Sequence, residues 1–497
     1  MKSTSSYRWL WIAAIVAAVA LRIFFVFTTE DADDGDGPMY EELATSLRTA
    51  GIFGMDLGQD LPSAVDVRMP GYPMFLAAIS RVLGVGEKRQ MVVQAMVDVG
   101  TCFLVAMLAT WLVPPHWRKR TALVALWLAA VCPFLAFYCG VALTEVLATF
   151  WTAAALVALA AACAGSEYVT WGRAAAAPAH ARNRIFSLLS NRWFLGGLCV
   201  GIGTLVRPET PLLLVALAVV LAWRWRRIAD WRKLARACAL AAAGLLIPLI
   251  PWTARNAITL HEFQPLAARY AQLPSEYVPH GFMDWTGTWL VRYRDVYMTP
   301  WNLGADQLHV SDLPASAIDN DQERARVQAL YDDYDSRCCD YTPEWDAQFG
   351  ELARERTARH PLRTYFTVPF ERSFVLWLRP RIELSQFYGD FWPPLEQLRD
   401  NPEDFAVTAL FGALGVFYSA LAFAGVWRAM RRRAEWPAPQ RWAIAFLAIF
   451  CVVRTIYFVQ IDTPEPRYLL ECYPAVFALG AIYFARPKTA TNAPGSG

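Results

Sequence analysis

The chain has 497 residues, of which 56% are hydrophobic and only 18% are charged, and its formal net charge is +2. A soluble protein carries about 25% charged residues, so this composition excludes an ordinary soluble globular protein. The arginines fall in scattered short clusters rather than along one face, which gives no indication of nucleic-acid binding.

Apolar runs of about 20 residues recur along the chain and predict an all-α polytopic membrane protein. The first run is longer than a signal-peptide core and no small-x-small cleavage site follows it, so it is expected to remain as a span. The fifth and sixth runs are short and meet at Arg207-Pro208. These two runs could instead form one broken hairpin, so the predicted number of spans is ten to within about two. The ten predicted spans are residues 9–27, 91–113, 122–139, 141–164, 194–206, 208–223, 237–252, 405–427, 442–459 and 468–484.

Basic clusters indicate how these spans are oriented, because cytoplasmic loops are enriched in Lys and Arg. With ten spans, the clusters at 118–120, 173–192, 224–236 and 428–433 all fall on one side with both termini, and that side is predicted to be cytoplasmic. The predicted organisation is a first span (1–27), a first extracytoplasmic loop (28–90), spans two to seven (91–254), a large extracytoplasmic loop (255–404), spans eight to ten (405–485) and a disordered cytoplasmic tail (486–497).

Both extracytoplasmic loops contain helix signals. Residues 39–49 are expected to form a helix, and residues 72–83 form an apolar stretch that is too short to span and is expected at the membrane interface. In the large loop, Thr342-Pro343-Glu344 predicts a helix start, with a capping side chain followed by proline. Arginines alternate with Phe, Trp and Leu over 361–381, which suits a helix lying on the membrane surface.

The first loop also carries Asp36 and Arg68 in a chain that is otherwise mostly apolar. A carboxylate can take a proton from an acceptor hydroxyl, and an arginine fork suits phosphate binding. The two residues therefore favour an enzyme that acts on a lipid phosphate.

Several short motifs follow one another in a fixed order along the chain. They are Asp36-x-x-x-Tyr40-x-x-x-Ala44-x-x-Leu47, Gly51-x-Phe53, Arg68-x-Pro70-Gly71-Tyr72-Pro73, Pro133-Phe134 to Thr144-Glu145, Leu205-x-Arg207-Pro208, Pro251-Trp252-x-x-Arg255-Asn256 and Arg467-Tyr468. In this order and topology the chain resembles GT-C glycosyltransferases of the family 39 type, among them the bacterial relatives of protein O-mannosyltransferases and the lipid A aminoarabinose transferase. The resemblance covers residues 8–265 and the last span, whereas 265–361 matches nothing familiar.

The resemblance implies a polytopic GT-C fold in the bacterial inner membrane, with its active site facing the periplasm. It also implies inverting transfer of one sugar, a hexose or pentose, from a polyprenyl-phosphate carrier to a lipid, glycan or protein acceptor. Direct displacement of phosphate needs only one carboxylate as base, whereas a glycosidase needs a second as acid. A lipid or glycan acceptor is favoured, because the large loop is small for a peptide-binding domain.

Asp36 matches the family's loop aspartate and is therefore the predicted catalytic base. The alternative is a solvated acidic loop, since Glu30, Asp31, Asp33 and Asp34 precede it. The chain departs from many relatives, which carry Asp-Glu here, because its next residue is Gly37. A second acid must come from elsewhere or be absent.

Tyr40 and Glu145 are the predicted acceptor-binding or sugar-binding residues. Tyr40 lies one helical turn after Asp36, so it would face the same side and could help to position a sugar. Packing of Tyr40 against the 72–83 stretch is an equal alternative. Glu145 is expected at the outer end of a span, where an ionised group costs about 2.5–3.5 kcal/mol within the bilayer. The alternative is a helix-end charge exposed to water. Two roles are considered for the tryptophans of the large loop, stacking on sugar rings and ordinary packing. These are Trp285, Trp289 and Trp301.

Four arginines are predicted at the outer interface and are candidates for binding the carrier phosphate: Arg68, Arg207, Arg255 and Arg467. Snorkelling towards lipid headgroups is the alternative, and Arg68 and Arg207 are the first choices. Arg22, inside the first span, is expected to pair internally or to snorkel.

No metal site or cofactor is predicted, because neither the six histidines nor the ten cysteines show ligand spacing. A divalent cation held through waters by the acidic stretch stays open. Two other functions also stay open, a polyprenyl-linked sugar transporter or flippase and a non-catalytic envelope-assembly protein with the same fold. Transporters usually show internal repeats, and none is found here.

Overall fold

The computed structural model describes residues 3–29, 36–167, 184–268, 270, 272–273, 276–382, 387, 389 and 394–485. The regular secondary structure of this part of the chain is helical apart from one two-stranded hairpin. Six of its helices are long and apolar enough to cross a membrane, which confirms the predicted integral membrane protein. They are α1 (Ser3–Thr28), α4 (Glu87–Trp111), α7 (Glu145–Cys163), α11 (Trp231–Thr259), α18 (Pro402–Arg431) and α19 (Ala438–Phe458).

The other four predicted spans take shorter or broken forms. The third bends by 48° between Pro115–Ala130 and Pro133–Gly140, and it makes a seventh span if the pair is counted as one. Helices of 13 residues, α9 and α10, are about 20 Å long, less than the roughly 30 Å of hydrocarbon. The count of ten therefore stays a prediction. The segments concerned are α5 (Arg118–Ala130), α6 (Pro133–Phe137), α9 (Arg192–Thr204), α10 (Leu212–Arg224), η9 (Pro466–Cys472) and α20 (Tyr473–Ala481).

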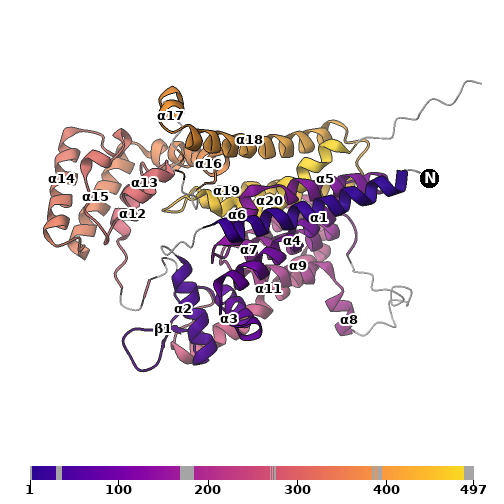
Figure 1. Ribbon diagram of the computed structural model, residues 1–497, viewed down its shortest axis with the longest axis horizontal. Helices are drawn as coiled ribbons and strands as arrows, with labels where there is room; N and C mark the ends of the chain where they lie inside the picture. The colour runs from indigo at the N-terminus through magenta and orange to yellow at the C-terminus, as the bar shows by residue number, and fades with distance from the viewer. Residues whose placement is uncertain are drawn as a thin grey trace, which may run out of the picture.

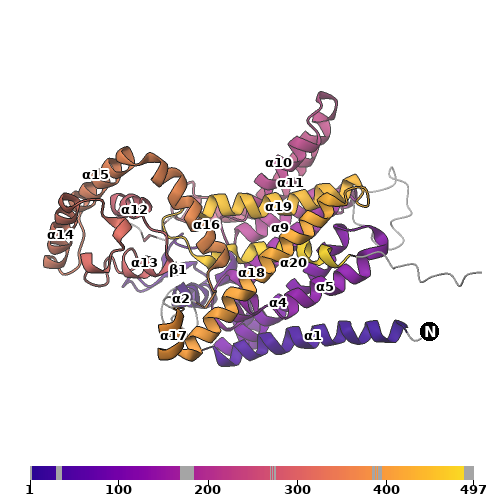
Figure 2. The same ribbon diagram turned by 90° about the horizontal axis from the view of Figure 1, so that it is seen from above.

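The long helices run side by side along the longest dimension of the molecule (Figure 1). The start of α1 lies at one end of this bundle, and the helices of residues 280–359 in the large loop lie beyond the other end. Seen from above, α10 and α11 lean away from α1 on the far side of the bundle (Figure 2). Remaining short elements are η1 (Pro115–Trp117), η2 (Tyr138–Gly140), α8 (Arg184–Leu189), η5 (Ile228–Asp230), η6 (Val310–Asp312), η7 (Ala315–Ala317) and η10 (Ile482–Phe484).

Small residues let the helices of the bundle pack closely. A Cβ on Gly197 of α9 would overlap the carbonyl oxygen of Ala241 in α11, and one on Gly425 of α18 would overlap that of Leu479 in α20. Backbones in direct contact are typical of helix association in membranes, where lipid removes the hydrophobic drive between helices.

Arg22 is buried inside this bundle rather than snorkelling outward. Its Nε donates to Asp98 of α4 at 2.8 Å, and its two terminal nitrogens donate to the carbonyls of Ala130 at 2.7 Å and Ala129 at 3.0 Å. Both charged side chains are at most 1% exposed. The predicted internal pairing is thus confirmed, with Asp98 as the partner.

The first loop folds against the end of the bundle as two helices joined by a hairpin. The predicted helix at 39–49 and the apolar stretch at 72–83 are both present. The residues Glu30, Asp31, Asp33 and Asp34 and the predicted tail 486–497 lie outside the described part of the chain. The elements are α2 (Asp36–Thr49), β1 (Gly54–Met55), β2 (Ser63–Ala64) and α3 (Gly71–Leu83).

The large loop is a helical unit with a hydrophobic core of its own, and we call it the insertion. Trp285 and Trp289 are fully buried in that core, so they pack rather than face a sugar, while Trp301 is 39% exposed. Thr342 accepts a hydrogen bond from the Trp345 amide, which confirms the predicted helix start. The insertion contains α12 (His280–Gly287), α13 (Tyr293–Met298), α14 (Asp321–Ser336), α15 (Pro343–Arg359), the π-turn η8 (Arg363–Thr367), α16 (Val368–Leu378) and α17 (Pro394–Asp400).

Candidate active site

Nine charged residues from widely separated segments form one continuous network of ion pairs, here called the charged cluster. Most of the site residues predicted from the sequence belong to it, and the exceptions are Tyr40 and Arg255. Its members are Asp36, Arg68, Glu145, Arg207, Glu209, Arg454, Glu465, Arg467 and Glu471.

Asp36 is the first residue of α2 and forms ion pairs with two arginines. One is Arg68, and the other is Arg467, whose Nη2 lies 3.6 Å from Asp36 Oδ2. The positive end of the α2 dipole also favours a carboxylate at this position. The Asp36 side chain is 29% exposed, so it is accessible from outside the cluster.

Arg207 lies in the break between α9 and α10 and is the centre of the cluster. Its Nη1 is 3.0 Å from Glu145 Oε1, and its Nε is 2.8 Å from Glu209 Oε1 and 3.9 Å from Glu471 Oε1. The guanidinium also lies over the ring of Tyr468, 5.1 Å from its centroid. A broken helix hairpin is thus what brings this arginine into the site.

Arg467 connects the two halves of the cluster. Its Nη1 lies 3.7 Å from Glu145 Oε1, and its Nε lies 2.5 Å from Glu465 Oε2, while Nη2 reaches Asp36. Glu145 therefore contacts the arginine that contacts the predicted base. At Gly37, where many relatives of the resembled family carry a second acid, a Cβ would lie 3.7 Å from the carbonyl oxygen of Ala142, which is an ordinary contact.

Four members of the cluster were not predicted from the sequence: Arg454, Glu209, Glu465 and Glu471. Arg454 Nη2 lies 2.6 Å from Glu471 Oε1, and the Thr152 hydroxyl donates to the other oxygen of that carboxylate at 2.7 Å. An ionisable residue inside an apolar run is a functional-site signal in its own right, and Arg454 and Glu471 both carry that signal. Applied systematically, the rule would have found them.

The cluster has a net charge of −1, from four arginines and five carboxylates, if every group is ionised. Three of its buried guanidinium nitrogens, Arg68 Nε, Arg454 Nη1 and Arg467 Nε, have no hydrogen-bond partner among the described residues, although Arg467 Nε lies within ion-pair distance of Glu465. A buried donor without a partner costs about 1–3 kcal/mol. Such donors are suited to an anionic ligand.

Tyr40 is buried beside this network. Its ring meets Tyr72 edge-on at 5.2 Å between centroids, and the Arg68 guanidinium lies 5.9 Å from its centre. Burial, and then the neighbouring Asp36 carboxylate, raise the pKa of the Tyr40 hydroxyl to about 12. Tyr40 therefore stays protonated at neutral pH, and it both packs against the 72–83 stretch and lies next to the candidate base.

Arg255 lies apart from the cluster, in the last turns of α11. Its Nη1 donates to the Val65 carbonyl at 2.8 Å and to Asn256 Oδ1 at 2.9 Å, and Nη2 donates to the Phe53 carbonyl. The guanidinium also lies over the rings of Phe53 and Trp252. It secures the hairpin of the first loop, and its predicted phosphate contact stays untested.

The described residues contain no group of three or more His, Cys, Asp or Glu side chains arranged to hold a metal ion. Within the cluster each carboxylate is instead opposed by at least one arginine. Glu30, Asp31, Asp33 and Asp34, the acidic residues that precede Asp36 and were considered for holding a cation through waters, lie outside the described residues.

Gly71 joins the first loop to the break between α9 and α10. Its amide donates to the Leu205 carbonyl at 2.6 Å, and a Cβ on Gly71 would lie 2.6 Å from the same oxygen. Arg68 is three residues before this contact, and Arg207 is two residues after it. The Pro-Gly motif thus sets the spacing between two of the cluster's arginines.

Gly71→Ala is therefore expected to separate Arg68 from Arg207 and to reduce activity by about 10²-fold, the cost of a misplacement of about 1 Å. Gly287→Ala is the matched control, because nothing lies within 4 Å of a Cβ there and the site is in the insertion. The measurement is the turnover rate of each variant with a polyprenyl-phosphate sugar, the donor that the sequence resemblance implies. Equal rates for the two variants would contradict this role of Gly71.

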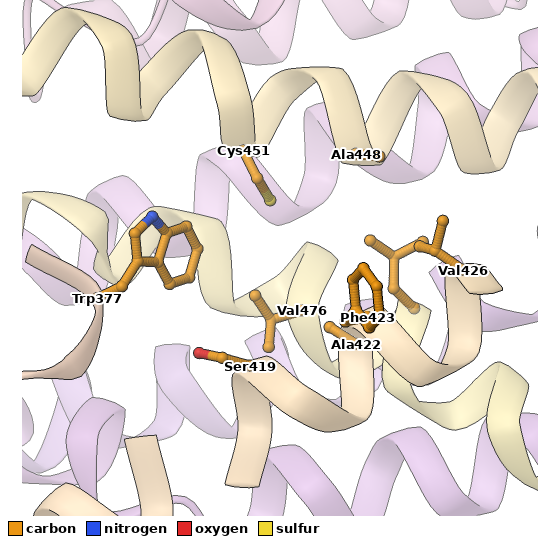
Figure 3. Close-up of a pocket in the computed structure, with 9 residues that line it drawn as sticks. Trp377, Ser419, Ala422, Phe423, Val426, Ala448, Cys451 and Val476 are labelled. Carbon is orange, nitrogen blue, oxygen red and sulfur yellow. The ribbon is translucent and has the colours of Figure 1, made fainter. Parts of the chain in front are cut away.

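An apolar cavity of about 220 Å³ is lined by residues of α16, α18, α19 and α20 (Figure 3). Ala448 and Cys451 of α19 line one side, and Cys451 is one helical turn before Arg454. Trp377 of α16 lies at one end of the cavity and donates to the Thr455 hydroxyl at 2.9 Å. The remaining lining residues are Ser419, Ala422, Phe423, Val426, Val476 and Leu479.

No protein-family model matches the sequence, and no curated protein matches it. Among solved structures, the chain is similar to the archaeal oligosaccharyltransferase AglB from Archaeoglobus fulgidus, in complex with an inhibitory peptide and a dolichol-phosphate, with 16% identity and a TM-score of 0.48 over 96% of this chain and 50% of that one. It is also similar to ArnT from Cupriavidus metallidurans bound to undecaprenyl phosphate, with 14% identity and a TM-score of 0.39 over 91% of this chain and 77% of that one. The chain spans about half the length of the archaeal protein.

Proposed function

We propose that the chain is an inverting glycosyltransferase that moves one sugar from a polyprenyl-phosphate carrier to an acceptor hydroxyl or amine. The observation that carries the proposal is the ion pairing of Asp36 with Arg68 and Arg467 within a cluster of four arginines. A general base next to several guanidinium groups is what displacement of a sugar from a phosphate requires. The order of the sequence motifs supports the same function.

The reaction needs one proton transfer and one displacement. Asp36 accepts the proton of the acceptor group, whose freed electron pair attacks the anomeric carbon of the sugar. The bond between that carbon and the phosphate oxygen breaks, and the electron pair leaves with the polyprenyl phosphate. Attack opposite the leaving group inverts the configuration, and no covalent enzyme intermediate is needed.

Arg68, Arg467 and Arg207 are proposed to hold the leaving phosphate, with Arg454 behind them. All four are engaged with carboxylates, so a phosphate enters by taking guanidinium hydrogen bonds from those carboxylates. Transfer of Arg68 and Arg467 from Asp36 to the phosphate would free the carboxylate oxygens of Asp36 to accept a proton from the acceptor group. Binding of the donor would thereby activate the base.

Glu145 and Tyr40 are proposed to orient the acceptor or the sugar, since both lie next to arginines that contact Asp36. Glu145 would supply the second acid that Gly37 does not. The apolar cavity beside Cys451 is proposed to take the first isoprenoid units of the carrier, because it lies one turn from Arg454 and its lining side chains are almost all apolar.

The site is proposed to face the periplasm from the bacterial inner membrane, with both termini in the cytoplasm. The positive-inside pattern supports this orientation. A lipid or glycan acceptor is favoured over a protein, because the insertion is filled by its own core. No described residue group indicates a divalent cation, and polyprenyl phosphate release measured with and without a chelator tests whether one takes part.

The proposal is tested by incubating the purified protein with polyprenyl-phosphate sugars and membrane extract and measuring released polyprenyl phosphate. Release is expected, and Arg467→Gln should raise the donor KM by about 10–100-fold, because a hydrogen bond to a charged group is worth about 1.5–3 kcal/mol. Arg326→Gln is the matched control, since this arginine pairs with Glu355 on the exposed surface of the insertion. No release from any donor would overturn the proposal in favour of a transporter or an assembly protein.

A further inference from the structure

The helix α16 and the turn before it present a regular apolar stripe to the outside. Phe366, Phe370, Phe374 and Leu378 are 67%, 64%, 51% and 40% exposed, and Leu362 is 71% exposed. Their spacing of four residues places them on one face of a helix. In an integral membrane protein, a stripe of this kind lies in the lipid interface.

Arg372 points to the opposite, buried side of α16 and is only 3% exposed. Its Nε donates to the Leu290 carbonyl at 2.7 Å, and its Nη1 donates to the carbonyls of Val459 at 3.1 Å and Ile461 at 3.0 Å. These three acceptors are main-chain groups, so the contact depends on where the backbones lie and not on which side chains they carry.

The three carbonyls belong to two different parts of the molecule. Leu290 is fully buried in the core of the insertion. Val459 and Ile461 follow the end of α19 and lead directly to Glu465 and Arg467. The segment 459–467, here called the α19–η9 loop, therefore carries two members of the charged cluster, and Arg372 joins it to the insertion.

A buried guanidinium is costly, because desolvation disfavours its charge. Burial lowers the pKa of Arg372 to about 10, and the nearby Asp462 opposes that shift. The side chain is nevertheless charged at neutral pH. Arginine suits the position, since its planar fork presents donors in several directions, whereas a lysine ammonium is a point charge that does not bridge separate carbonyls in the same way.

We infer that Arg372 is a positioning residue: it holds the α19–η9 loop against the insertion, so that Arg467 and Glu465 keep their places in the charged cluster. The inference rests on the proposed function. It also makes the membrane-surface helix α16 part of the support of the active site, since the same helix carries the lipid-facing stripe, Arg372 and the cavity residue Trp377.

The test compares Arg372→Lys with the native chain and with Arg356→Lys. Arg356 is the matched control, because it is a fully buried arginine whose hydrogen bonds to Thr288, Glu323 and Ser316 stay within the insertion. The rate of polyprenyl phosphate release at saturating donor and the thermal midpoint are measured for each protein. Arg372→Lys is expected to lower that rate by about 10–100-fold, in line with the cost of misplacing a catalytic group, with a thermal midpoint no lower than that of Arg356→Lys. The control is expected to stay within about threefold of the native rate, because its bonds do not reach the α19–η9 loop.

A distance measurement makes the inference independent of the assay. Spin labels at Gln328 on α14 and Gln460 in the α19–η9 loop, both exposed, should give a broader distance distribution in Arg372→Lys than in the native chain or in Arg356→Lys. An unchanged distribution, or a native rate in Arg372→Lys, would overturn the inference. Absence of release by the native chain would instead overturn the proposed function, and the distance measurement would still decide whether the tether exists.

Discussion

Replacement of Asp36 by Asn is expected to lower the rate of sugar transfer by about 10²–10⁴-fold, the contribution of a positioned general base. The amide has the same shape, and its one oxygen can still accept a hydrogen bond from Arg68, but it cannot take the acceptor's proton. The donor KM should change much less than the turnover rate, because the arginines stay in place. The measurement is the release of polyprenyl phosphate as a function of donor concentration.

Asp60→Asn is the matched control for this prediction, since Asp60 is an exposed aspartate in the same loop outside the charged cluster. It should transfer sugar at the native rate. Equal release by the native chain and Asp36→Asn would leave the enzyme but assign the base to another carboxylate, with Glu145 the first candidate because it shares Arg467 with Asp36.

Arg22→Met is expected to reduce the free energy of unfolding by about 3–5 kcal/mol, the usual cost of leaving one partner of a buried ion pair uncompensated. Asp98 would remain 1% exposed without the guanidinium, and the carbonyls of Ala129 and Ala130 would each lose a donor. The measurement is the denaturant or thermal melting curve of the purified protein in detergent.

The double variant Arg22→Met/Asp98→Leu should recover most of that loss, because it removes both charges and keeps apolar volume in the bundle. Arg8→Met, at the exposed start of the same helix, should change stability by less than about 0.5 kcal/mol. A loss in the double variant equal to that in Arg22→Met would show that the side-chain volume of Arg22, and not its ion pair, stabilises the bundle.

The sequence predicted those features that depend on contiguous residues. Apolar runs predicted the long spans, because a helix that crosses the hydrocarbon core needs about 20 consecutive apolar residues. Thr342 predicted the start of α15 because a cap acts on amides within the next turn. The break at Arg207-Pro208 was also visible, since Pro removes a helical hydrogen bond and disfavours the helical conformation before it.

The site was predicted in part. Asp36, Arg68, Glu145, Arg207 and Arg467 were named from motifs, and the structure brings all five together. Arg255 had the same motif support, yet its guanidinium is occupied by backbone carbonyls of the first loop.

Which charged groups meet depends on the tertiary structure. Arg454 lies near the end of one apolar helix and Glu471 near the start of the next, and the sequence does not specify the face on which either side chain finds a partner. Their pairing depends on how α19, η9 and the break between α9 and α10 pack together. Helix packing sets the angles and rotations of these segments, and a charge buried in lipid surroundings is tolerated only where that packing supplies an opposite charge. Contiguous sequence thus predicts the long apolar helices and the residues that could carry chemistry, whereas helix packing selects which of those residues form one site.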